Sequence, residues 1–277
     1  MNLTAANETE ANRDANTTVR YVVKGEHTIF YPGDREKSYW PGDDHQVTVH
    51  DLHSIPEDQR PSVEKNGFAL LNHNTAITDY DDQKQINNIF YPEMCELAKQ
   101  VNGAEKAIAF GHVARSDASG ARQHLQPSFA AHVDYGRKTI EEYTRNILGD
   151  EADQWLQKRV VLMNFWRPIN TVYRSPLALC DAATVADDDL NFAEVRGGLD
   201  DPDRPPLYGW NLSYNPDHKW YYAFEMQPEE IFAFKLYDSK EGVPQYTGHT
   251  AIELPWTDNE TPPRNSIEIR TISFIDE

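Results

Sequence analysis

The chain has 277 residues, and its 45 Asp and Glu against 26 Lys and Arg give a formal net charge of −19. This acidic balance excludes nucleic acid and anionic membrane surfaces as expected partners, because both are bound through clustered Lys and Arg. No apolar run is long enough to span a bilayer, and the two cysteines, Cys95 and Cys180, form no CxxC motif. Two reduced thiols and the lack of a secretory signal favour a cytoplasmic protein.

The N-terminal half of the chain is predicted to hold a polar tail, short strands and one helix. Residues 1–18 are polar and aperiodic, which favours a disordered tail before a single domain over residues 19–277. From 83 to 101, apolar side chains recur at spacings of three and four, which predicts a helix that Pro92 kinks or begins. Short apolar segments, several of them expected strands, cover 21–23, 28–31, 47–55, 68–71 and 107–113.

The C-terminal half is predicted to be mostly β. Helices are expected over 137–148 and 151–158, and the acidic 181–206 stretch with its Pro and Gly residues is expected to be an insertion or lid loop. Strands are expected over 160–166, 177–180, 207–214, 219–224, 231–236 and 266–274. Many short strands with turn signals between them predict a mainly β fold with flanking helices (α+β), built as a sandwich or barrel.

The most informative motif is His132-Val133-Asp134. Residues i and i+2 of a strand point to one face, so the imidazole and the carboxylate would project together into one cavity. That pair is two-thirds of a 2-His-1-carboxylate facial triad, which holds Fe(II) and leaves part of the metal open. By itself the spacing also describes a His that is salt-bridged beside a turn Asp. His112 and His124 are weaker alternative ligands, because neither has an acidic partner at i+2.

The remaining pieces of such a site are expected late in the chain. His218 and His249 are the only histidines after His132. His249 is followed fifteen residues later by Arg264-Asn265-Ser266 and then by the alternating 267–270 segment. A planar guanidinium with a hydroxyl beside it can grip a carboxylate, such as the distal one of 2-oxoglutarate, from one strand face. Arg270 competes with Arg264 for that role, because both lie on the same face of the same strand.

Several segments from residue 132 to 270 resemble one known family. They are His132–Asp134, Asn164–Pro168, Pro176–Asp181, Trp220–Tyr222, Phe234–Ser239 and Pro263–Arg270. In order and content they are similar to the fungal and bacterial hydroxylase/desaturase family, which includes gibberellin-desaturase-like and cephalosporin-methoxylase-related proteins.

The resemblance implies a double-stranded β-helix of the jelly-roll or cupin type. It also implies oxidation that depends on Fe(II), 2-oxoglutarate and O2, acting on a small-molecule intermediate of secondary metabolism. His132, Asp134 and His249 would be the iron ligands, and Arg264 would anchor the co-substrate.

Five further residues are candidates for contacts in the same cavity. Asn164 could hydrogen-bond the co-substrate or be a strand residue whose amide is satisfied within the protein. Lys235 could be a second anchor or an edge-strand residue facing solvent. Trp166, Arg167 and Tyr135 are predicted to contact substrate, with Arg167 otherwise paired to Asp181 on a neighbouring strand.

Two other functions stay open from the residues alone. One is a metal-dependent cupin-type dioxygenase or isomerase that does not use 2-oxoglutarate, and the other is a non-catalytic jelly-roll binding domain. The chain has no G-x-S-x-G, P-loop, H-E-x-x-H or G-x-G-x-x-G motif, so hydrolase and nucleotide-binding functions have no support. Hydroxylation, desaturation, epoxidation and oxidative rearrangement are not distinguished. Neither the substrate nor the oligomeric state, a homodimer included, follows from the sequence.

Overall fold

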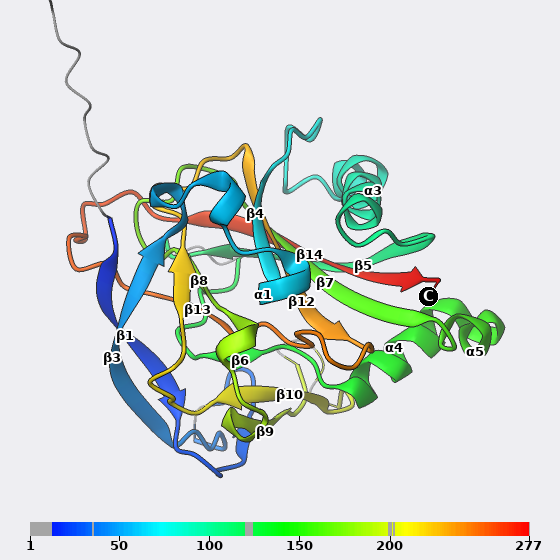
Figure 1. Ribbon diagram of the computed structural model, residues 1–277, viewed down its shortest axis with the longest axis horizontal. Coiled ribbons are helices and arrows are strands. Elements are labelled where there is room, and N and C mark those ends of the chain that lie inside the picture. The colour runs from blue at the N-terminus through cyan, green and yellow to red at the C-terminus, as the bar shows by residue number, and fades with distance from the viewer. Residues whose placement is uncertain (1–12, 35, 120–123, 199–200, 202, 277) are drawn as a thin grey trace, which may run out of the picture.

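A computed structural model describes residues 13–34, 36–119, 124–198, 201 and 203–276. Two β-sheets face each other, and most of the helical turns lie at their edges and outer faces (Figure 1). This confirms the predicted mainly β fold with flanking helices. No helix in the described residues is long and apolar enough to cross a membrane.

The larger sheet has nine strands in the order β1-β3-β11-β8-β13-β6-β10-β9-β2. Its central strands β8, β13, β6 and β10 are antiparallel neighbours, whereas β3 and β11 run parallel, as do β2 and β9. The strands span β1 Ala15–Val22, β2 Thr28–Phe30, β3 Gly42–Asp51, β6 His132–Val133, β8 Leu177–Cys180, β9 Leu190–Val195, β10 Leu207–Leu212, β11 Trp220–Tyr222 and β13 His249–Ala251.

The smaller sheet is antiparallel throughout, in the order β4-β12-β7-β14-β5. Its strands span β4 Phe68–Asn72, β5 Lys106–Ser116, β7 Arg159–Pro168, β12 Glu230–Asp238 and β14 Asn265–Ile275. Both faces of this sheet are buried. Ile272 and Phe274 point into the core between the two sheets, while Ile267 and Ile269 point outward into a second core under α3.

The helices are short and partly irregular. They span α1 Val63–Asn66, α2 Gln83–Gln85, α3 Tyr91–Asn102, α4 Arg137–Leu148 and α5 Ala152–Trp155, with single 3-10 turns at 52–54, 57–59, 149–151, 182–184 and 187–189. The predicted 83–101 helix is present, but Ile86–Phe90 widens into a π-helical turn before α3. Pro92 has no N–H to donate to the preceding turn, which favours this widening. The predicted 151–158 helix begins within one residue of its expected start but ends early, since only Ala152–Trp155 is α-helical.

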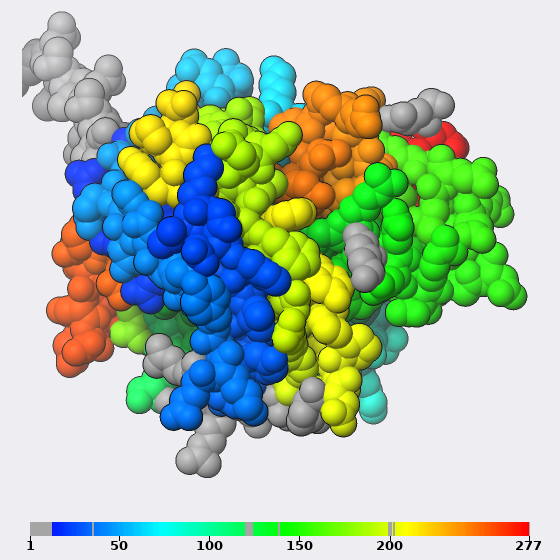
Figure 2. Space-filling view, turned by 90° about the horizontal axis from the view of Figure 1, so that it is seen from below, coloured from blue at the N-terminus to red at the C-terminus, as the bar shows by residue number. Residues whose placement is uncertain are grey.

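The start of the chain is more ordered than the sequence predicted. Residues 1–12 of the expected 1–18 tail lie outside the described residues, but Ala15–Val22 forms β1, paired along its length with β3. Every second side chain of β1 is buried, beginning with Ala15 and Thr17, whose small size gives a weak hydrophobic signal. β1 is an edge strand of the nine-stranded sheet and also contacts the segment before β6, where Ala131 donates its N–H to the Arg20 carbonyl. Figure 2 shows β1 and β3 in blue beside the yellow-green residues of β9 and β10.

The 181–206 stretch is also more regular than a lid loop. Leu190–Val195 forms β9 between β10 and β2, so this part of the stretch belongs to the sheet. A single domain over residues 19–277 stays a prediction. It is in keeping with the core between the sheets, to which residues from Leu52 to Phe274 contribute.

Candidate metal centre

Three side chains from different parts of the chain meet on the inner face of the nine-stranded sheet. His249 on β13 is the direct cross-strand neighbour of His132 on β6, and Asp134 follows β6. One ligand atom from each lies within 4.8 Å of the other two. Oδ1 of Asp134 is 3.4 Å from Nε2 of His132 and 3.8 Å from Nε2 of His249. Antiparallel pairing therefore brings together two imidazoles that are 117 positions apart in the sequence.

Both imidazoles present Nε2 to the place where the three ligand atoms meet. Nδ1 of His132 is 2.7 Å from the carbonyl oxygen of Ala130, and Nδ1 of His249 is 3.1 Å from that of Thr247. A carbonyl oxygen only accepts, so Nδ1 donates in each ring and the lone pair lies on Nε2, as in metal-binding histidines generally. Burial, and then the neighbouring His132, lower the pKa of His249 to about 4. That ring is therefore neutral at pH 7 and able to bind a cation.

Charged side chains from the facing sheet reach Asp134. Arg270 on β14 places Nη2 3.3 Å from Oδ2 of Asp134 and 3.0 Å from Oε1 of Glu268. Arg115 on β5 donates to the same Glu268 oxygen over 3.4 Å. Burial favours a raised pKa for Asp134, but Arg270 and the two imidazoles hold this pKa well below its ordinary value. The carboxylate is thus ionised at neutral pH, as a metal ligand must be.

A second buried cation, Arg264, lies immediately before β14. Its Nη1 donates to the Ser175 carbonyl over 2.6 Å, and its guanidinium lies 5.4 Å from the ring centre of Trp166. Among the described residues it makes no ion pair and its Nε has no hydrogen-bond partner, although the carboxylates of Asp117 and Glu268 act to raise its pKa. Burial, and then repulsion by Arg115, lower the pKa of Arg264 to about 10, so it stays charged at pH 7.

Two more polar side chains on this inner face lack partners in the described structure. They are the hydroxyl of Ser266 and both amide atoms of Asn164, which is the cross-strand neighbour of Arg270. Buried polar atoms normally find a partner, so each unpaired one calls for an explanation. Together with Arg264 they form a buried, cationic and hydrogen-bonding surface suited to a dicarboxylate. The donor set at His132, Asp134 and His249 suits Fe(II), so the residues present fit both a ferrous ion and 2-oxoglutarate.

Two of the predicted contact residues point away from this cavity. Arg167 and Lys235 lie on the outer face of the five-stranded sheet, beside Ile267 and Met163 respectively. Arg167 donates to the carbonyls of His73 and Pro228 and not to an acidic neighbour. Lys235 is buried in an ion pair with Asp238 at 2.7 Å, so it is neither a co-substrate anchor nor an edge residue in solvent. Both predictions are corrected by strand alternation, which turns these side chains outward.

The two predicted aromatic contacts do face inward. Trp166 is 2% exposed and lies beside Arg264, and Tyr135 is 6% exposed with Arg270 5.5 Å from its ring centre. Each ring is thus a surface against which a guanidinium stacks. Their contact with substrate stays a prediction.

The alternative histidines are engaged elsewhere. Nδ1 of His112 is 2.9 Å from the hydroxyl of Tyr91, and His124 is paired with Asp81 at 3.2 Å. His218 is buried against Asp189. None of the three belongs to a metal-binding group among the described residues.

Gly209, which sequence reasoning did not single out, lets β10 approach the metal-binding segment. A Cβ at this position would lie 2.5 Å from the carbonyl oxygen of Val133 and 2.8 Å from that of Asp134. We expect Gly209→Ala to push Asp134 out of place and to lower the free energy of unfolding by about 1–3 kcal/mol. Chemical denaturation and metal titration of this variant test the prediction. Gly111→Ala is the matched control, since nothing lies within 4 Å of its Cβ; equal effects of the two changes would contradict the prediction.

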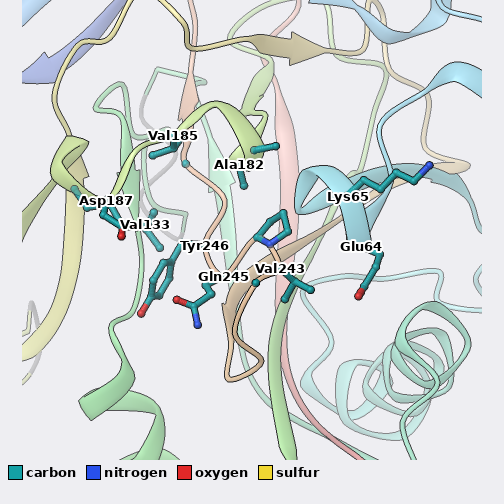
Figure 3. Close-up of a pocket in the computed structure, with 14 residues that line it drawn as sticks. Glu64, Lys65, Val133, Ala182, Val185, Asp187, Val243, Gln245 and Tyr246 are labelled. Atoms are coloured by element: carbon teal, nitrogen blue, oxygen red, sulfur yellow. The ribbon is translucent and has the colours of Figure 1, made fainter. Parts of the chain in front are cut away.

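A cavity of about 540 Å³ lies behind the metal-binding segment. Figure 3 shows Ala182, Val185 and Asp187 on one side of it and Gln245 and Tyr246 on another. Val133 lines the cavity but belongs to the core on the outer face of the nine-stranded sheet, whereas His132 and Asp134 project from the inner face. None of the three candidate ligands lines it. The cavity is therefore separated from the candidate metal centre by the strands themselves.

Comparison with known proteins shows which family this chain resembles. A family model described as "Oxidoreductase/YMDC permease-like domain" matches residues 9–274. An alpha-ketoglutarate-dependent dioxygenase, phiK, of a fungal species is 32% identical over 222 residues, covering 76% of this chain and 78% of the relative. The hydroxylase/desaturase efuI of Hormonema carpetanum is 30% identical over 251 residues, covering 82% and 83%.

A solved structure supports the same family. The iron and alpha-ketoglutarate-dependent endoperoxidase NvfI superposes with a TM-score of 0.82 at 25% identity, over 95% of this chain and 99% of that chain. This likeness confirms the double-stranded β-helix that was expected from the resemblance, and with it Fe(II), 2-oxoglutarate and O2 as cofactor and co-substrates. The chain therefore belongs to the family of Fe(II)/2-oxoglutarate-dependent dioxygenases that contains these fungal hydroxylases and desaturases.

Proposed function

We propose that His132, Asp134 and His249 hold the Fe(II) ion, and that Arg264 with Ser266 anchors the far carboxylate of 2-oxoglutarate. The observation that carries this proposal is the convergence of the three ligand atoms within 4.8 Å, with both Nδ1 atoms tied to backbone carbonyls. Iron, 2-oxoglutarate and O2 supply the oxidising chemistry, and the protein supplies position, charge and exclusion of water.

The choice of Arg264 over Arg270 rests on their partners. Nη2 of Arg270 already contacts both Asp134 and Glu268, whereas Arg264 makes no ion pair among the described residues. A buried guanidinium without an ion-pair partner is costly, so an incoming carboxylate gains most at Arg264. The unpaired Ser266 hydroxyl, two residues along the same strand face, is placed to donate to the same anion.

The unpaired amide of Asn164 is assigned to the end of the co-substrate nearest the metal. Its strand neighbours on either side are Arg270, which contacts Asp134, and Phe234, whose ring centre is 4.9 Å from that of His249. Both amide atoms lack partners among the described residues. We therefore place Asn164 beside the carboxylate and keto oxygens that chelate the metal.

The substrate is a small molecule of secondary metabolism, in keeping with the hydroxylase/desaturase relatives. Hydroxylation, desaturation, epoxidation or oxidative rearrangement all fit the site. A cytoplasmic location remains a proposal, supported by two cysteines, Cys95 and Cys180, that are both free.

Conversion of 2-oxoglutarate to succinate in the absence of substrate tests the proposal. Enzymes of this kind often convert 2-oxoglutarate slowly even without substrate. Purified protein with Fe(II), ascorbate, O2 and 2-oxoglutarate is therefore expected to form succinate. Omitting Fe(II), or adding a chelator, is expected to stop it. Iron binding without any succinate formation would instead favour the cupin-type function that does not use 2-oxoglutarate.

A further inference from the structure

We propose that Glu268 is the positioning residue of this metal centre. In this proposal, which rests on the proposed function, Glu268 holds Arg270 against one oxygen of Asp134, so that Asp134 offers the metal only its other oxygen. Glu268 also places a negative charge that offsets Arg270 beside a divalent cation.

The contacts form a continuous chain from the facing sheet to the candidate ligand. Glu268 is the strand neighbour of Val113 on β5, and Arg115, two residues further along β5, donates to its Oε1. The same Oε1 accepts from Nη2 of Arg270, and this Nη2 also reaches Oδ2 of Asp134. The side chains of Glu268, Arg270 and Asp134 are 8%, 14% and 15% exposed, so water screens these contacts only weakly.

These contacts give the two carboxylate oxygens of Asp134 different partners. Oδ2 faces Arg270, whereas Oδ1 faces Nε2 of His132 and Nε2 of His249. A carboxylate held in this way would offer a metal Oδ1 alone. Holding a metal through one oxygen would keep more of its coordination positions open than chelation through both oxygens.

The negative charge of Glu268 also favours metal binding. A guanidinium next to a metal ligand repels the incoming cation, and this repulsion is strong where water is excluded. Glu268 lies 3.0 Å from that guanidinium and compensates for it. Glu268 does not belong to the metal-binding group of His132, Asp134 and His249, so it acts through Arg270 and not as a ligand. Loss of its charge should therefore weaken metal binding even before the co-substrate is present.

The test is a cobalt titration of metal-free protein under anaerobic conditions without 2-oxoglutarate. Co(II) is the probe because its visible bands report the number of ligands. Glu268→Gln keeps the shape and an acceptor oxygen but removes the charge. We expect its Co(II) affinity to fall about 10–100-fold. At saturating metal, its dissociation constant for 2-oxoglutarate is expected to change far less. Glu260→Gln, an exposed carboxylate, is the matched control and should bind as wild type.

A second variant separates charge from reach and guards against a folding defect. Glu268→Asp keeps the charge but withdraws it by one methylene, so its Co(II) affinity should lie between those of wild type and Glu268→Gln. Wild-type affinity in either folded variant would overturn the proposal, even if the melting temperature falls, because a purely structural role moves only the latter. Failure of the wild-type protein itself to bind Co(II) would instead overturn the proposed function.

Discussion

Replacing His132 or Asp134 by alanine is expected to lower 2-oxoglutarate-dependent succinate formation by about 10³-fold or more, while the fold survives. A bound metal supplies several kcal/mol of stabilisation to the reaction, and each 1.4 kcal/mol is tenfold in rate. His132 begins the two-residue strand β6 and Asp134 follows it, and neither belongs to the hydrophobic core. The measurement is the initial rate of succinate release, with circular dichroism to confirm folding.

His112→Ala is the matched control for that experiment. His112 was also a sequence-level candidate for the metal, but its imidazole lies on the outer face beside Tyr91. Its replacement should leave succinate formation within about twofold of wild type, as is usual for changes distant from a site. An active His132→Ala or Asp134→Ala variant would refute the assignment of the metal ligands.

Arg264→Met is expected to raise the 2-oxoglutarate concentration needed for half-maximal succinate formation about 100-fold. One or two charge-assisted hydrogen bonds to the far carboxylate are worth about 1.5–3 kcal/mol each, and 1.4 kcal/mol is a factor of ten. Unlike most substitutions in the core, this change should not lower the free energy of unfolding. Removing a buried cation that makes no ion pair among the described residues should leave the free energy of unfolding equal to that of wild type or higher.

Two comparisons sharpen this second experiment. Arg270→Met should raise the 2-oxoglutarate requirement much less than Arg264→Met, because Arg270 serves Asp134. Arg167→Met is the matched control, since its guanidinium is equally buried but hydrogen-bonds to two carbonyls on the outer face. It should lower the free energy of unfolding and leave the requirement unchanged. A larger shift in Arg270→Met than in Arg264→Met would exchange the two roles.

Much of the fold was predictable from the sequence because its strands are apolar and bounded by turn residues. Strands β7, β12 and β14 and helices α3 and α4 lie where periodicity placed them. The missed elements have weak signals for physical reasons. Ala15 and Thr17 bury little apolar area in β1, and β9 lies in an acidic stretch with Pro and Gly that is typical of loops.

The candidate site was predictable only where alternation is unambiguous. His132 and Asp134 share a face by spacing alone. In β7 and β12, however, both faces of the strand are buried, so hydrophobicity does not reveal which set of side chains points inward. Arg167 and Lys235 were assigned to the cavity for this reason. The contact between Arg270 and Asp134 joins two residues 136 positions apart and depends on the packing of the two sheets.

The most direct test is an anaerobic titration of the metal-free protein with Fe(II) and then 2-oxoglutarate, followed by visible absorption. We expect a weak charge-transfer band that appears only when both are present, because the co-substrate then chelates the iron. Iron binding without that band, or no iron binding at all, would contradict a 2-oxoglutarate-dependent iron centre at His132, Asp134 and His249.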